Sequence, residues 1–173
     1  MIELKVLSRE AIPSALEMAR HYRLISEPDE AESICQDILA VEPDNQDALI
    51  TLILSLCDRF SDDGMVAAFE KARDMVARLN DRYCKSYYSG ILFERRAKHH
   101  FSNGSPGSGR LAYGWYVKAL YAFNEALSSC DPNNQDAVLR WNSCARFINE
   151  HPELRPEEDS EPNLLLDAFE TPH

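Results

Sequence analysis

The sequence has no long hydrophobic run: no stretch of about 18 consecutive apolar residues, the length that a membrane span needs, occurs in it. Its first residues carry charges where a signal peptide needs an apolar segment, so we expect no secretion signal. Strict alternation of apolar and polar residues, which is typical of a half-buried β-strand, is missing as well. These absences favour an all-α protein, no membrane partner and a cytoplasmic location.

The cysteines include no closely spaced pair. They are Cys35, Cys57, Cys84, Cys130 and Cys144. Structural zinc sites use ligands a few residues apart, and a disulfide framework normally uses an even number of cysteines. We therefore predict reduced thiols on apolar helix faces, with no metal site and no cofactor.

Basic residues are scarce, with 18 Lys and Arg against 29 Asp and Glu, which gives a formal net charge of −11. Because an acidic chain repels phosphates, nucleic acid is not an expected partner. Residues 61–120 are the exception, with 10 basic against 6 acidic residues. This section would attract an acidic peptide or the chain's own acidic end.

Apolar residues recur at helical spacing almost throughout. The pattern predicts one helical domain over residues 1–150 and an acidic, proline-rich tail over residues 151–173. Residues 102–109, which are Gly, Ser, Asn and Pro, predict a mobile loop. The seven predicted helices cover approximately residues 9–25, 31–42, 45–60, 65–79, 82–101, 110–129 and 134–149.

The chain repeats itself. Residues 42–52, EPDNQDALITL, return nearly letter for letter as residues 131–141, DPNNQDAVLRW. Such self-similarity is typical of architectures that stack copies of one small unit, and these usually present a surface to a partner.

Three units share a pattern of small and aromatic residues. The first contains Ala15-x2-Met18-Ala19-x2-Tyr22, Ala31-x3-Cys35 and Pro43; the third contains Ser89-Gly90-x2-Phe93, Ala119-x3-Phe123 and Pro132. The second, Leu49-x2-Leu52-Ile53-x2-Leu56 with Met65-x3-Phe69-x2-Ala72, is weaker, since Ile53 replaces the usual small residue. This unit resembles the tetratricopeptide repeat, in which a small residue lets two helices of a hairpin approach closely. About 17 extra residues separate the two motifs of the third unit, which predicts longer helices and a projecting loop.

The resemblance implies a superhelix (solenoid) of three helical hairpins and a capping helix, with a concave groove lined by the first helix of each hairpin. The residues expected to bind a partner there are Leu16, Arg20, Arg23, Ile50, Leu54, Tyr87, Ile91, Arg95 and Leu139. The groove would also display Asp58 and Ser143. One subclass of the family clamps a chaperone's terminal carboxylate with Lys and Asn. Leu16, Arg20, Thr51, Cys84 and Tyr88 stand at the matching positions, so this clamp is absent.

No residues with the spacing of a catalytic set occur, and we predict that the chain is not an enzyme. The rings of His99 and His100 are adjacent on a helix and point in different directions, so they cannot share one metal. The loop at residues 104–110 contains glycines but lacks the Gly-Lys-Ser/Thr ending and the preceding strand of a phosphate-binding loop.

The expected function is therefore a non-catalytic protein-interaction adaptor that binds a peptide or protein segment in the groove. Alternatives are a chaperone resembling those of type III secretion, acting on an exported protein, and a regulatory subunit of an enzyme complex. Within the tail, Leu164–Phe169 forms an apolar island beside the acids Glu157–Glu161. We expect this island to dock in a groove of its own chain or of a second copy, which would give a homodimer.

Overall fold

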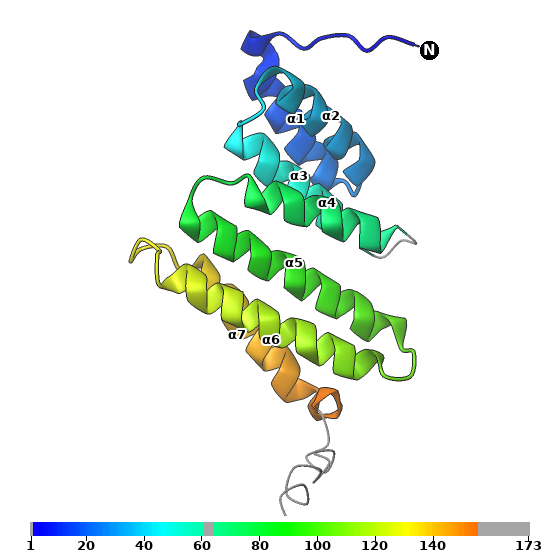
Figure 1. Cartoon of the computed structure of the whole chain (residues 1–173), viewed down its shortest axis with the longest axis vertical. Helices are drawn as coiled ribbons and strands as arrows, with labels where there is room; N and C mark the ends of the chain where they lie inside the picture. Colours follow the sequence, from blue (N-terminus) through cyan, green and yellow to red (C-terminus); the bar gives the residue numbers. More distant parts are fainter. Residues whose placement is uncertain (1, 61–63, 156–173) are drawn as a thin grey trace, which may run out of the picture.

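The computed structural model describes residues 2–60 and 64–155, and in these residues it is all-helical, with seven α-helices and no strand (Figure 1). This confirms the prediction of an all-α protein. The helices are α1 (Ile12–Leu24), α2 (Pro28–Val41), α3 (Gln46–Asp58), α4 (Met65–Ala77), α5 (Arg82–Asn103), α6 (Ser108–Leu127) and α7 (Asp136–Glu150). The predicted turn at residues 61–64 and the apolar island of the tail lie wholly or mostly outside the described residues. None of these helices is both long enough and apolar enough to cross a membrane.

Each helix packs against the one that follows it in the sequence, and the contact between α5 and α6 is the most extensive. Figure 1 shows the helices succeeding one another along the long axis of the molecule. The helices α1 and α3, and more weakly α3 and α5, also contact each other. The pairs α1–α2, α3–α4 and α5–α6 are therefore sequential helical hairpins, and α7 packs on the last of them.

The helix ends follow the local sequence. Pro13 and Pro28 stand in the first turns of α1 and α2, where a missing backbone N–H costs least. The side chains of Asn45 and Asp81 accept hydrogen bonds from the backbone N–H groups of Ala48 and Cys84, at 3.0 and 2.8 Å, and so cap α3 and α5.

The predicted loop over residues 102–109 is wrong in length. Helix α5 continues to Asn103 and α6 begins at Ser108, so only residues 104–107 connect them. Gly104 and Gly107 adopt φ values of 60° and 81°, in the left-handed region that favours glycine, and they end one helix and start the next within four residues. The extra residues of the third unit thus lengthen α5 and α6 and do not form a projecting loop.

The larger core cluster extends from Ala19 of α1 to Leu154, which lies after α7. A second, smaller cluster joins α1 to α2 and α3 through Ile12, Leu16, Ile38 and Ala48. The 3-10 turn Pro152–Leu154 packs on α6, where a Leu154 methyl would lie 3.6 Å from a Cβ placed on Gly109. The packed part of the chain therefore extends a few residues beyond the predicted boundary at residue 150. In its centre Phe123 of α6 lies directly against Gly90 of α5.

Glu32 of α2 links three helices. It accepts hydrogen bonds from Arg59 Nη1 at the end of α3, at 3.0 Å, and from Lys71 Nζ of α4. Burial alone would raise the pKa of Glu32, but hydrogen bonds and charge attraction from Lys71 and Arg59 lower it below its ordinary value. A carboxylate whose pKa is lowered by folding stabilises the folded state above its unfolded pKa, and this contribution disappears as pH falls through the folded pKa.

We expect Glu32→Gln to lower the free energy of unfolding by about 1 kcal/mol at pH 7, because it removes the charge that Lys71 and Arg59 neutralise. The difference from the wild type should shrink toward zero below about pH 4, where the carboxyl is increasingly protonated. Urea denaturation at both pH values measures it. Asp37→Asn, at an exposed position of α2 away from its first turn, is the matched control and should change the free energy of unfolding at pH 7 by less than about 0.5 kcal/mol. Equal losses for Glu32→Gln at the two pH values would contradict this role of Glu32.

Candidate functional site

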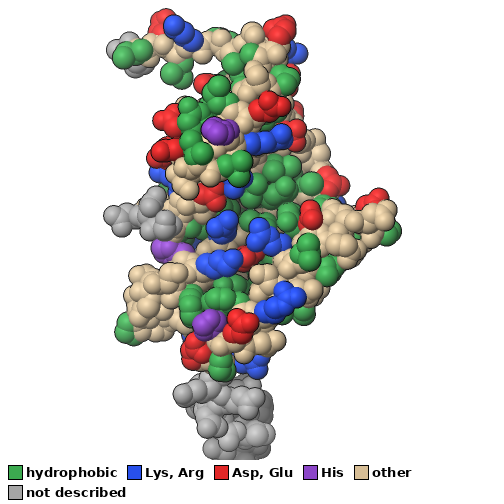
Figure 2. Space-filling model, turned by 180° about the vertical axis from the view of Figure 1, so that it is seen from behind, with side chains coloured by type: hydrophobic (Ala, Val, Ile, Leu, Met, Phe, Trp, Pro, Cys, Tyr) green, Lys and Arg blue, Asp and Glu red, His purple; other side chains and the backbone are tan. Residues whose placement is uncertain are grey.

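One face of the molecule is built from α1, α3, α5 and α7, the first helix of each hairpin and the last helix. Figure 2 shows this face, with Lys and Arg side chains gathered across its middle beside a recess lined by hydrophobic side chains. We call the charged residues that join these helices the charged row. Its members are Arg23, Asp58, Glu94, Arg95, Lys98 and Arg140.

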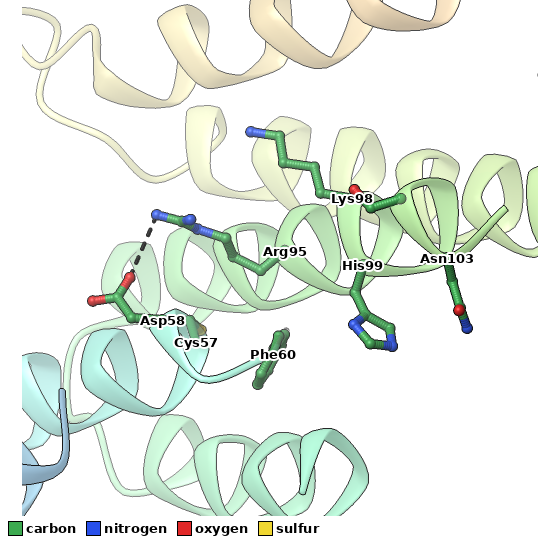
Figure 3. Close-up of a pocket in the computed structure, with 8 residues that line it drawn as sticks. Cys57, Asp58, Phe60, Arg95, Lys98, His99 and Asn103 are labelled. Atoms are coloured by element: carbon green, nitrogen blue, oxygen red, sulfur yellow. Dashed lines mark ion pairs between the residues drawn. The ribbon is translucent and has the colours of Figure 1, made fainter. Parts of the chain in front are cut away.

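The first part of the charged row joins three helices through Asp58. Arg23 Nε of α1 donates a hydrogen bond to Asp58 Oδ2 of α3 at 2.9 Å. Arg95 Nη2 of α5 lies 3.6 Å from the other carboxylate oxygen, Oδ1 (Figure 3). Arg23, Asp58 and Arg95 were all expected in the groove, and the structure brings them together.

The second part joins α5 to α7 through Glu94, whose side chain is 2% exposed. Lys98 Nζ lies 2.5 Å from Glu94 Oε1 and Arg140 Nη1 lies 3.5 Å from the same oxygen. Burial alone would lower the pKa of Arg140, but the charge of Glu94 and the neighbouring Tyr87 raise it. The second oxygen of this carboxylate, Oε2, is buried and has no hydrogen-bond partner among the described residues.

Two hollows open on this face, and Lys98 borders both. The larger, of about 440 Å³, lies between α3 and α5 (Figure 3). Asp58 faces Arg95 across it, and Lys98 and His99 project from α5 in different directions. Its lining residues are Cys57, Asp58, Phe60, Arg95, Lys98, His99, Ser102 and Asn103.

The smaller hollow, of about 270 Å³, lies between α5, α6 and α7. Two buried polar groups at this hollow lack partners in the described structure: Glu94 Oε2 and the Tyr116 hydroxyl. Burial raises the pKa of Tyr116, so its phenol stays protonated and can donate a hydrogen bond. Buried polar groups are rarely left unpaired, so the hollow offers hydrogen bonds to a group entering from outside, water included. The other lining residues are Lys98, Ser143, Cys144, Arg146, Phe147 and Glu150.

The remaining predicted groove residues divide by burial. Leu16 and Ile91 are only 8% and 2% exposed and belong to the core, so we no longer expect a partner to contact them. Ile50 and Leu54 are half-buried and pack against the core, and Tyr87 is stacked on Tyr83 with ring centroids 5.5 Å apart.

Two further predicted residues are open to solvent. Leu139 on α7 is 65% exposed. Arg20 on α1 lies 3.4 Å from Asp47 at the start of α3, and both side chains are more than half exposed. Because such an exposed ion pair contributes little to stability, Arg20 can exchange Asp47 for another acid.

The sequence did not identify Glu94 or Arg140 as site residues. The only signal for Glu94 was the spacing of Glu94 and Lys98, four residues apart on one helix. The basic residues of the section 61–120 are also divided by the fold. Arg95, Lys98 and His99 border the larger hollow, whereas Arg110 and Lys118 border a separate surface pocket on α6.

Three buried cysteines are unsuited to nucleophilic chemistry. Burial raises the pKa of Cys35, Cys57 and Cys144 to about 12, so these thiols are protonated at neutral pH. In the part of the chain that the structure describes, no three His, Cys, Asp or Glu side chains are grouped as a metal site requires. Comparison with known proteins finds no family model, no curated protein and no solved structure that matches this chain.

Proposed function

We propose that this chain is a non-catalytic protein-interaction module whose helical hairpins form a superhelix of the tetratricopeptide type. A peptide or an extended segment of a partner protein binds along the face of α1, α3, α5 and α7. The observation that carries this proposal is the pair of hollows that Lys98 borders. One of them contains two buried polar groups that find no hydrogen-bond partner among the described residues. The free thiols suit a reducing compartment such as the cytoplasm.

The charges of this face indicate the chemistry of the partner. Arg95 and Lys98 remain partly exposed although each has an acidic neighbour, and His99 adds a donor beside them. Half-buried Ile50 and Leu54 and exposed Leu139 supply apolar contact. An extended segment with acidic side chains or accessible carbonyl groups, and with one or two apolar anchors, fits this combination.

Peptide display against the full chain, using random 12-residue peptides as the probe, tests this proposal. We expect enriched peptides to carry more Asp and Glu than the starting library. Arg95→Gln combined with Arg146→Gln should weaken the best peptide about tenfold or more in titration calorimetry, equivalent to about 1.4 kcal/mol.

Arg82→Gln is the matched control, because Arg82 is an exposed residue of the same helix that lies 3.8 Å from Glu125 of α6. It should leave the affinity within about twofold of the wild type. Equal binding by all three proteins, or enrichment of basic peptides, would remove the assignment of this face.

A further inference from the structure

A second surface, distinct from the charged row, lies along α6. The helices α4 and α6 both pack on α5 but scarcely on each other (Figure 1). A pocket of about 540 Å³ opens between them. We call it the α6 groove; it is lined by Phe69, Arg73, Phe93, Trp115, Val117, Lys118 and Tyr121.

The α6 groove is apolar and open to solvent. Val117 and Tyr121 are 45% and 69% exposed, and the neighbouring Leu111 on the same helix is also exposed. Contiguous exposed apolar side chains of this kind mark interaction sites in soluble proteins. Two cations, Arg73 and Lys118, stand among these apolar residues, and the Lys118 ammonium lies 4.1 Å from the centre of the Trp115 ring.

A third cation at the α6 groove lacks an acidic partner. The guanidinium of Arg96 stacks between the rings of Phe69 and Trp115, 4.1 and 4.2 Å from their centres. It forms no ion pair within residues 2–60 and 64–155, and its Nε is buried without an acceptor. Burial lowers the pKa of Arg96, while the charge of Glu70 opposes that effect; Glu70 itself pairs with Arg73. A carboxylate at this place would supply the acidic partner that the stacked guanidinium of Arg96 lacks.

The chain contains a segment of the required composition. Residues 164–169 read Leu-Leu-Leu-Asp-Ala-Phe, and residues 156–173 contain six acids and no Lys or Arg. We propose that residues 164–169 of the same chain occupy the α6 groove, with leucine and phenylalanine side chains on its aromatic floor and Asp167 or Glu170 near Arg96. This inference is independent of the proposed function, because the α6 groove and the charged row use different residues.

The segment can reach the α6 groove. Arg155, the last described residue, borders a surface hollow that is also lined by Val117, and Val117 lines the α6 groove as well. The eight residues 156–163 span up to about 26 Å when extended. A helix with its side chains is about 10–12 Å across, so this length suffices to cross α6.

Amide hydrogen exchange of the full chain tests the proposal. We expect residues 164–169 to exchange about tenfold or more slowly than in a synthetic peptide of residues 156–173, which corresponds to about 1.4 kcal/mol of docking free energy. Val117→Asp with Tyr121→Asp, both at exposed positions, should bring the exchange to within about twofold of the peptide's rate. Leu24→Asp, at an exposed leucine of α1, is the control and should leave the protection unchanged.

Each other outcome contradicts docking of this segment in its own α6 groove. Wild-type exchange at the peptide's rate shows that the segment does not dock. Protection that falls on dilution, with a dimer mass in sedimentation, assigns the segment to a second copy. Protection that survives Val117→Asp with Tyr121→Asp but is lost in Arg95→Gln with Arg146→Gln places the segment on the face of α1, α3, α5 and α7.

Discussion

Gly90→Ala is expected to destabilise the protein by about 2–3 kcal/mol, although alanine is the better helix former. A Cβ atom on Gly90 would lie 2.4 Å from Cε1 of the Phe123 ring. Phe123 is completely buried, so the ring cannot move aside without displacing other core side chains. The close approach of α5 and α6 therefore requires glycine at this position, and the strain outweighs the gain in helix propensity.

Gly114→Ala is the matched control and should change the free energy of unfolding in the opposite direction. Gly114 lies within α6, and a Cβ atom placed there would meet nothing within 4 Å. The substitution should stabilise the protein by about 0.5–1 kcal/mol, because alanine restricts the unfolded chain and favours the helix. Urea denaturation of both variants measures the difference; stabilisation by both would refute the packing of α5 on α6 described above.

Lys98→Met combined with Arg140→Met should have the largest effect, a loss of about 3–5 kcal/mol at neutral pH. The two cations neutralise Glu94, whose carboxylate is buried among α5, α6 and α7. Without them the charge of Glu94 remains in a poorly solvated place, whereas the methionines keep most of the packing of the longer side chains.

Adding Glu94→Gln to that double variant should recover a large part of the loss, because the amide carries no charge. Arg82→Met is the surface control, since Arg82 pairs with Glu125 where both side chains are exposed, and it should cost at most about 0.5 kcal/mol. Thermal unfolding at one pH and salt concentration compares all the variants. If the triple variant proves no more stable than the double variant, Glu94 is not the group that the two cations stabilise.

The helix pattern was predictable because it depends on local chemistry. Asn45, Asp81 and Pro28 mark helix starts through hydrogen bonds and backbone angles that involve only nearby residues. The predicted connection between α5 and α6 was longer than the observed one, and the reason is physical. A segment of Gly, Ser and Pro indicates a break in a helix but not its extent, and Gly104 and Gly107 complete the reversal in four residues.

The site was only partly predictable, because the burial of a side chain depends on helices that are distant in the sequence. Leu16 and Ile91 have the spacing of groove residues, but adjacent helices cover them. An acidic residue such as Glu94 is normally expected on the surface. Its carboxylate is buried because two cations neutralise it, Lys98 on α5 and Arg140 on α7. The pair Glu94–Lys98 has the spacing of neighbours on one helix, but the contact of Glu94 with Arg140 on α7 leaves no periodic signal in the sequence.

The order in which the helices pack has a mechanical consequence. Since each helix is held mainly by its sequence neighbours, a disturbance in α1 or α2 reaches α7 only through every hairpin between them. The two longest helices, α5 and α6, share the most extensive contact in this series. A structural change confined to α1 and α2 is therefore expected to leave the contact between α5 and α6 intact.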